Sequence, residues 1–208
     1  MLSPIEKAYF GLNRYLPENS YSSLIAVLSK NPLPIKVVKP RNTKLGDYRP
    51  RWEKTGKPLI TINADLNPYS FLITLIHEIA HHVTWLKHQG KVKPHGEEWK
   101  AIYSEMAYQH FLGKSIFPPE IEAALKKYFT RTFASSCADP NLLRVLSNYD
   151  TMPDGHFLLE QLKEHTVFEL NGRIFKKGER RRKRFTCLEL STKRNYLVSA
   201  VCSVKIIE

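Results

Sequence analysis

The stretch LITLIHEIAHH, residues 72–82, sets two histidines four positions apart in an otherwise apolar run. Apolar residues at 72, 75, 76, 79 and 83 recur at three- and four-residue spacing, the pattern of a helix with one buried face. Asn67 suits the N-cap of this helix, Pro68 suits its first turn, and Gly90 ends the pattern. We therefore expect a core helix that carries two imidazoles.

His77, Glu78 and His81 form an HExxH motif on this helix. Residues four apart share a helix face and lie about 6 Å apart along the axis, so both imidazoles can reach one zinc ion. Glu78 lies about 100° round the helix from His77, where it can approach a water at the metal without becoming a ligand. The alternative is a pair of core histidines, each needing a hydrogen-bond partner inside an apolar helix.

A catalytic zinc ion commonly takes three protein ligands and keeps a fourth position for water. His82 follows His81 directly and points elsewhere, and His110 is distant in the sequence. His88 returns to the same face but about 10 Å farther along the axis. His95 follows a loop with Gly and Pro that lets the chain double back, so it is the best third ligand. His88 is the alternative if the helix ends early.

The rest of the chain predicts short helices and strands. Turn residues interrupt a helical N-terminal region, 5–28, near Pro17 and Asn19, and Gly46 predicts a turn between two strands. The expected strands are 33–40 and 59–63, and further helices are expected from about 95–96, over 119–129 and from about 139–140. Past Pro153 the alternating pattern predicts a small antiparallel β module.

The chain carries a net charge of +12, and residues 166–208 hold eleven Lys and Arg against four Glu. Such a basic excess favours an anionic partner, DNA above all, although it also fits a solvated surface. The run with the highest density of basic residues, 180–184, could instead be a solvated turn between two strands. Aromatic residues of this module, Phe175, Phe185 and Tyr196, could stack on bases or belong to its core. The basic run comprises Arg180, Arg181, Arg182, Lys183 and Arg184.

The cysteines Cys137, Cys187 and Cys202 include no CxxC pair, which excludes a cysteine-rich zinc site and predicts small buried side chains. No apolar run is long enough to span a bilayer, and the N-terminus lacks a signal-peptide pattern. We expect no membrane partner and a cytoplasmic protein, associated with the nucleoid if it binds DNA.

The residues HEIAHH followed by PHGEEWKAIYSEM resemble the SprT-like family, the metalloprotease domain of SprT and Spartan proteins. His95, Gly96 and Trp99 stand where that family has a His-Gly pair leading into an aromatic-bearing helix. The resemblance spans roughly residues 5–130. The zinc ribbon common at the C-terminus of the family is replaced here by a cysteine-poor basic β module.

The resemblance implies that His77, His81 and His95 hold one Zn²⁺ per chain and that Glu78 is the general base of peptide hydrolysis. It also implies an edge strand near 60–63 that aligns an extended protein substrate. Tyr103 is a candidate for oxyanion stabilisation, although an aromatic residue at its spacing also fits the core.

The fold class expected is α+β: a zincin-like metalloprotease domain at 1–130, a helical or irregular connector at 131–165 and a basic antiparallel β module at 166–208. The leading function is a zinc-dependent endopeptidase that acts on DNA-associated or DNA-crosslinked proteins. One alternative is a DNA-binding protein whose metal site is structural or weakly active. Another is a peptidase whose basic module binds an acidic protein.

Overall fold

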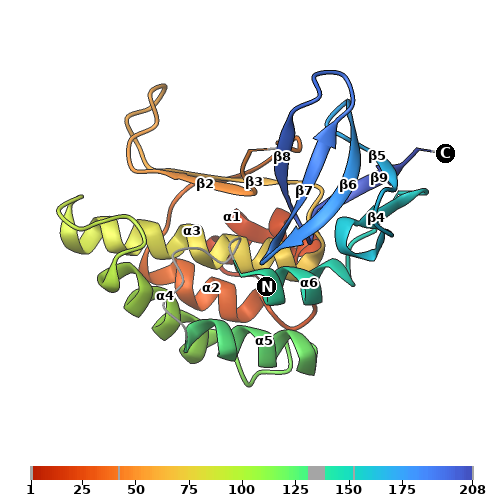
Figure 1. Ribbon diagram of the computed structural model, residues 1–208. Coiled ribbons are helices and arrows are strands. Elements are labelled where there is room, and N and C mark those ends of the chain that lie inside the picture. Colours follow the sequence, from red (N-terminus) through yellow and green to blue (C-terminus); the bar gives the residue numbers. More distant parts are fainter. Residues whose placement is uncertain (1, 42, 131–138, 152, 208) are drawn as a thin grey trace. The chain divides into compact units, whose positions relative to one another are not determined.

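The computed structural model describes residues 2–41, 43–130, 139–151 and 153–207 and divides into two compact units, Met1–Tyr149 and Asp150–Glu208. The described residues form helices and two sheets, which confirms a mixed α+β protein (Figure 1). The first unit contains α1 (Pro4–Tyr9), η1 (Phe10–Tyr15), α2 (Tyr21–Lys30), β1 (Ile35–Val38), β2 (Gly46–Arg49), β3 (Leu59–Asn63), α3 (Pro68–His88), α4 (Glu97–His110), α5 (Pro119–Phe129) and α6 (Pro140–Ser147).

The sheet of the first unit has the strand order β1-β3-β2, with β1 parallel and β2 antiparallel to β3. The expectation of an edge strand near 60–63 is wrong, because β3 lies in the centre and pairs on both sides. The turn expected at Gly46 is also wrong, since Gly46 begins β2. The free edges of this sheet are β1 and β2.

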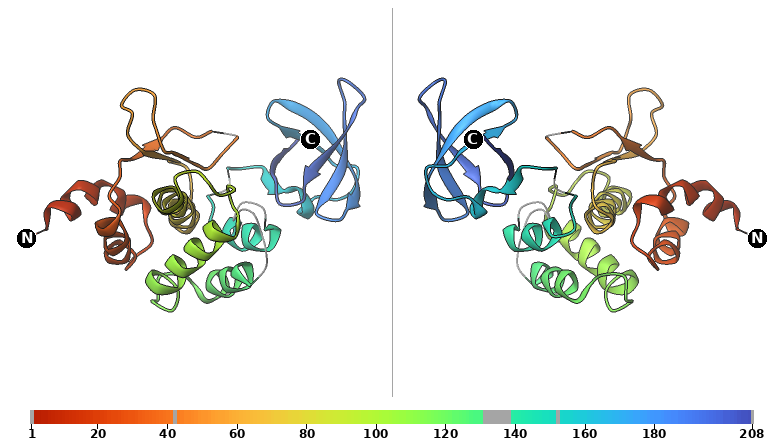
Figure 2. Two further views of the ribbon diagram at one scale, coloured as in Figure 1. Left: turned by 90° about the vertical axis from the view of Figure 1, so that its left-hand side faces the viewer. Right: turned by 90° about the vertical axis from the view of Figure 1, so that its right-hand side faces the viewer.

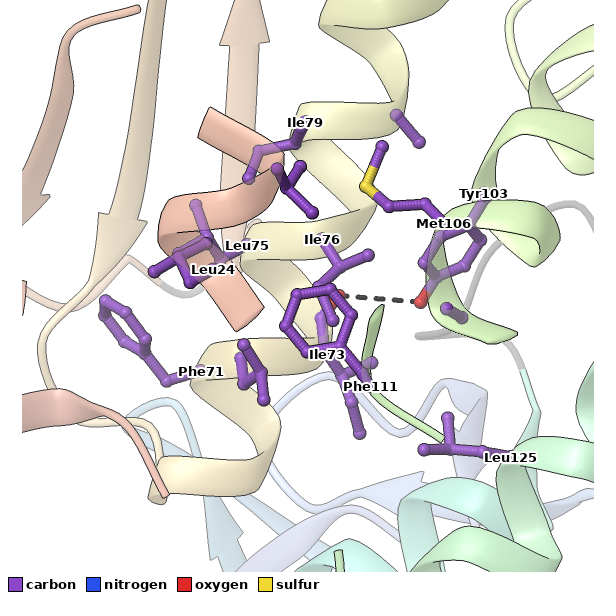
Figure 3. Packing of buried hydrophobic residues seen from close by; sticks show 14 of the residues in the cluster. Leu24, Phe71, Ile73, Leu75, Ile76, Ile79, Tyr103, Met106, Phe111 and Leu125 are labelled. Carbon is purple, nitrogen blue, oxygen red and sulfur yellow. Dashed lines mark hydrogen bonds between the residues drawn. The ribbon is translucent and has the colours of Figure 1, made fainter. Parts of the chain in front are cut away.

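Helix α3 lies under this sheet, with α4 and α5 on its other side (Figure 2). The Asn67 side chain accepts a hydrogen bond from the Ser70 backbone, as expected of an N-cap. Leu72, Leu75 and Ile79 are fully buried. They pack with residues of α2, α4 and α5 in the continuous core drawn in Figure 3. This packing makes α3 a rigid support for whatever its side chains hold.

The second unit is a six-stranded sheet in the order β4-β9-β5-β6-β7-β8. Its own core includes Phe168, Phe175, Phe185 and Cys187. The strands between Val167 and Ile206 form the small antiparallel β module expected from the alternating pattern, and β4 is added from the preceding segment. The elements are β4 (His156–Leu158), η3 (Leu159–Gln161), β5 (Val167–Leu170), β6 (Arg173–Arg181), β7 (Arg184–Glu189), β8 (Asn195–Ser199) and β9 (Ser203–Ile206).

The described part of the expected connector 131–165, residues 139–151 and 153–165, is divided between the two units. Leu142 and Leu146 of α6 are buried in the core of the first unit, while β4 pairs with β9 in the second. Cys187 is buried and Cys202 half-buried, and Cys137 lies outside the described residues. No helix in the described ranges is long and apolar enough to cross a membrane.

Candidate metal centre

Three imidazoles meet at one point of the first unit. His77 and His81 project from successive turns of α3, and His95 reaches them from the loop before α4. The Nε2 atoms of His77 and His81 are 3.2 Å apart, and His95 Nε2 lies 3.2 Å and 3.0 Å from them, respectively. Among the described residues this is the group of His, Cys, Asp or Glu side chains able to hold a metal ion.

This triangle fits zinc. Nitrogens held at about 2.0–2.1 Å from a tetrahedral zinc ion lie about 3.3 Å from one another. Without a cation the same arrangement is unfavourable, because each neutral imidazole nitrogen is either a donor or an acceptor. Among three facing nitrogens at least one pair must therefore be of the same kind. A cation at the centre would remove that conflict.

Burial favours the neutral, ligating form of these histidines. It lowers the pKa of His77 to about 3, with further contributions from His81 and His95. Burial and His95 lower the pKa of His81 to about 4, and burial lowers the pKa of His95. Metals bind neutral imidazole, so the site is prepared to bind a cation at neutral pH.

The loop before α4 adopts special backbone conformations to deliver the third imidazole. His95 has a φ of +58°, in the left-handed region that few non-glycine residues adopt. Gly96 closes a turn by donating its N–H to the Lys93 carbonyl at 2.9 Å. A Cβ at position 96 would lie 2.9 Å from that carbonyl oxygen, so glycine is needed beside His95. This is the physical reason for the His-Gly pair.

Trp99 of α4 packs against all three imidazoles. Its ring centroid lies 4.7 Å from those of His77 and His95 and 5.1 Å from that of His81, which it stacks at 29°. The indole is 1 % exposed. Its buried Nε1 has no hydrogen-bond partner among the described residues. The indole thus packs the three rings in the orientation in which their Nε2 atoms face one another.

Glu78 lies beside the histidines and against β2. A hydrogen bond from the Tyr48 backbone reaches its carboxylate. Gly46 also lies close to this carboxylate, since a Cβ there would lie 2.7 Å from Glu78 Oε1. Burial raises the pKa of Glu78 to about 8, and the nearby Asp47 carboxylate adds to the effect. A cation at the three histidines would oppose both effects and favour the carboxylate.

His82, which the helix geometry directs away from the metal, ties β2 to α3. Its Nδ1 lies 3.1 Å from the Tyr48 hydroxyl, and the two rings are in contact. Burial raises the pKa of that hydroxyl to about 12 and lowers the pKa of His82. Tyr48 therefore contacts two residues one turn apart on α3, Glu78 through its backbone and His82 through its side chain. Sequence reasoning missed this strand and both of its contacts.

The other residues considered as site members lie outside the three-histidine cluster, although the Tyr103 ring contacts His77 with centroids 5.6 Å apart. Helix α3 continues to His88, which is not in the three-histidine cluster, and His110 ends α4. Tyr103 is 2 % exposed, and its hydroxyl donates to the Ile73 carbonyl at 3.5 Å (Figure 3). Tyr103 is therefore a core residue, which was the alternative to a role in oxyanion stabilisation.

A cleft of about 610 Å³ opens over the cluster. Gly46 and Tyr48 of β2 line it, as do Trp85 of α3 and the loop 90–95. The three histidines and Glu78 share this cleft. A ligand in this cleft would contact the cluster, which distinguishes the site from a closed structural metal site.

The basic run of the second unit forms the tip of the β6–β7 hairpin. The last pair of the ladder joins Arg181 to Arg184, and Arg182 in the turn has a φ of +54°. All five side chains of 180–184 are exposed. Phe175 and Phe185 are buried, so base stacking by these two rings is excluded and their role as core residues is confirmed.

Comparison with known proteins adds one finding. Residues 36–126 match the sequence model of the SprT-like family. No curated protein and no solved structure gives a significant match. The matched segment runs from β1 to α5 and includes the HExxH helix, the His-Gly loop and α4. Residues 36–126, less than half of the chain, are therefore similar to the SprT-like family.

Proposed function

We propose that the first unit is a zinc-dependent endopeptidase. The observation that supports this most directly is the three-histidine triangle with the Glu78 carboxyl beside it in an open cleft. His77, His81 and His95 would hold one zinc ion per chain. The match to the SprT-like family supports the same class of enzyme.

Zinc at this site would supply a Lewis acid that makes a water more acidic and polarises a peptide carbonyl. Glu78 has the position of a general base: it is next to His77 in the sequence, shares the cleft with the ligands and does not belong to their triangle. Its carboxylate would accept the proton of the attacking water and pass it to the leaving amine. The Tyr48 backbone hydrogen bond orients that carboxylate.

The edge of β2 is suited to align an extended substrate. The Asn63 N–H donates to the Leu45 carbonyl, so by antiparallel alternation Asp47 and Arg49 bond to β3. The backbone groups of Gly46 and Tyr48 then face away from β3. Both residues line the cleft, and the Tyr48 N–H already donates to Glu78. A substrate strand could pair with the Tyr48 carbonyl and the Gly46 backbone beside that carboxylate.

The substrates proposed are proteins bound or crosslinked to DNA. The β6–β7 hairpin presents a compact group of cations, and Arg181, Arg182 and Arg184 have no carboxylate partner among the described residues. Cations in such a group can neutralise successive phosphates without reading sequence. Binding of this kind would bring the peptidase to DNA-associated proteins.

Proteolysis is tested with fluorescein-labelled, denatured casein and three samples: the wild-type protein with zinc, the same protein after chelation, and Glu78→Gln with zinc. We expect cleavage by the first sample only, and restored cleavage when zinc is returned to the second. A second assay uses a histone incubated with and without duplex DNA. Cleavage by Glu78→Gln at the wild-type rate would contradict the assignment of the base.

The alternative function is a DNA-binding protein whose metal site is structural or weakly active. The open cleft and the buried carboxyl beside the histidines favour the peptidase, because a purely structural site needs neither. Zinc binding and DNA binding by a wild-type protein that cleaves neither casein nor histone would favour the alternative.

A further inference from the structure

We propose that the free edge of β1 binds a short extended acidic segment of another protein as an added strand. This edge lies on the opposite side of the small sheet from β2, because the strand order is β1-β3-β2. It is therefore separate from the candidate metal centre, and its occupation does not depend on proteolysis.

The first observation is a second groove in the first unit. It measures about 660 Å³ and is lined by β1, the prolines before it and the N-terminal helical segment. Ile35, Lys36 and Val37 all line this groove. Side chains of consecutive strand residues alternate between the two faces of a sheet. Three consecutive strand residues can line the same groove only where the groove runs along the edge of the strand.

The hydrogen-bond pattern shows which backbone groups this edge offers. The Pro34 carbonyl accepts from Ile60 N–H and the Val38 carbonyl from Ala64 N–H, so the backbone of these residues faces β3. By alternation, the N–H and C=O groups of Ile35 and Val37 face outward. They form no backbone hydrogen bond among the residues that the structure describes. Such a row of open groups can pair with an incoming strand.

The groove is already shaped by fixed contacts. The Tyr9 hydroxyl donates to the Leu33 carbonyl at 2.9 Å and accepts from the Leu33 N–H at 3.1 Å. Tyr15 stacks on Phe71 of α3, with ring centroids 5.2 Å apart. These contacts hold the N-terminal segment against the start of β1. A partner strand would therefore meet a preformed site, which lowers the entropic cost of binding.

Charge selects the partner. The groove is lined by two cations, Arg14 from the N-terminal segment and Lys36 from β1, and by no carboxylate. Both side chains are exposed, and within the described ranges neither has a carboxylate partner. Both cations lie over aromatic rings, Arg14 over Tyr15 and Lys36 over Trp52. An acidic peptide can pair its carboxylates with these cations and its backbone with the outward N–H and C=O groups of β1. A nucleic acid has no peptide groups to pair with this edge.

Binding is measured by fluorescence anisotropy on an array of ten-residue peptides in which Asp or Glu alternates with Val, Ile, Thr or Phe. A matched array has Lys in place of each acid. The protein is the full chain carrying Glu78→Gln, so that the peptides stay intact. We expect binding to acidic members at least tenfold tighter than to their Lys counterparts.

Two kinds of variant locate the binding. Val37→Pro removes one outward N–H and leaves the inward bonds of β1 in place, and it should raise Kd about fivefold. Arg14→Glu with Lys36→Glu should raise Kd at least about tenfold. The charge-matched control is Lys114→Glu with Lys127→Glu, two exposed residues outside the groove, and it should change Kd less than twofold. Thermal unfolding shows whether each variant folds. If Val37→Pro does not fold, the double variant Arg14→Glu with Lys36→Glu tests the site.

Three results would overturn the proposal. The first is a Kd for acidic peptides that the groove variants leave unchanged, or a Kd that is the same for acidic peptides and their Lys counterparts. The second is binding of a single-stranded oligonucleotide that is lost with the charge pair but kept in Val37→Pro, which would make the groove a nucleic-acid site. The third is a concentration-dependent dimer of the chain that Val37→Pro abolishes.

Discussion

Replacing Gly46 with Ala tests whether β2 positions the carboxylate of Glu78. The added Cβ would lie 2.7 Å from Glu78 Oε1, 2.9 Å from Glu78 Cγ and 2.7 Å from Thr74 Cγ2. The shortest of these distances are about 0.8 Å below ordinary carbon contact. Gly46 has no positive φ, so strain from backbone conformation does not contribute. The effect of the substitution is therefore steric.

The size of the effect follows from these distances. Thr74 is buried on α3 and cannot move far, so Glu78 must shift by a comparable amount. A displacement of about 1 Å in a catalytic group costs about 100-fold in rate, or about 2.7 kcal/mol in the activation barrier. Overpacking should also lower the free energy of unfolding by about 1–3 kcal/mol. Zinc content should be unchanged, because the histidines are not among the residues that the Cβ meets.

The assay measures kcat/KM on labelled casein, zinc content and the thermal midpoint for three variants. Gly11→Ala is the matched control, since a Cβ there has no neighbour within 4 Å, and it should keep wild-type activity. Gly46→Ala with Thr74→Ser removes one clash and keeps the one with Glu78, so activity should stay low. Wild-type kcat/KM in folded, zinc-loaded Gly46→Ala would refute the reasoning.

Three further predictions concern the histidines and the hairpin. His88→Ala should retain zinc, as judged by elemental analysis, because His88 lies outside the cluster; loss of zinc would place it in the site. Metal-free Glu78→Gln, which lacks the opposing contribution of the carboxyl whose pKa is raised to about 8, should lose stability as pH falls from about 6.5 toward 3. Burial holds the pKa values of His77 and His81 at about 3 and 4, so the unfolded chain binds more protons. Urea midpoints at pH 7 and pH 5 measure this loss, which should shrink when His77→Gln is added; an equal loss in that variant would contradict it. Arg181→Ala with Arg184→Ala should weaken duplex DNA binding in filter assays and lower the slope of log K against log salt by about two, whereas an unchanged slope would show that these side chains contact no phosphate.

The parts of the fold that local signals determine were predictable. The N-cap Asn67, the apolar periodicity and the glycine after the pattern predict α3 within a few residues of its observed bounds. Spacing on that helix predicted that His77 and His81 share a face. A loop containing Gly90 and Pro94 made His95 the preferred third ligand, with His88 as the alternative. The histidine triangle is consistent with each of these inferences.

Strand β2 was not predictable in the same way. Its residues, Gly46 to Arg49, include no β-branched side chain, and Gly and Asp are depleted in strands. The strand forms because its backbone pairs with β3 and because Tyr48 contacts Glu78 and His82 across the fold. The β2–β3 pairs join residues 10 to 16 positions apart and the Tyr48 contacts join residues 30 and 34 positions apart, which no local pattern encodes. The short strand β4 was missed for the same reason, since it depends on pairing with β9.

The central claim is that three histidines hold one catalytic zinc ion. The most direct measurement is zinc content by elemental analysis of wild type, His95→Ala and Glu78→Gln, purified in parallel and reconstituted with zinc. We predict one zinc per chain in wild type and in Glu78→Gln, and clear loss in His95→Ala. A wild-type chain that binds no zinc after reconstitution, or a His95→Ala variant that retains it fully, would contradict the account.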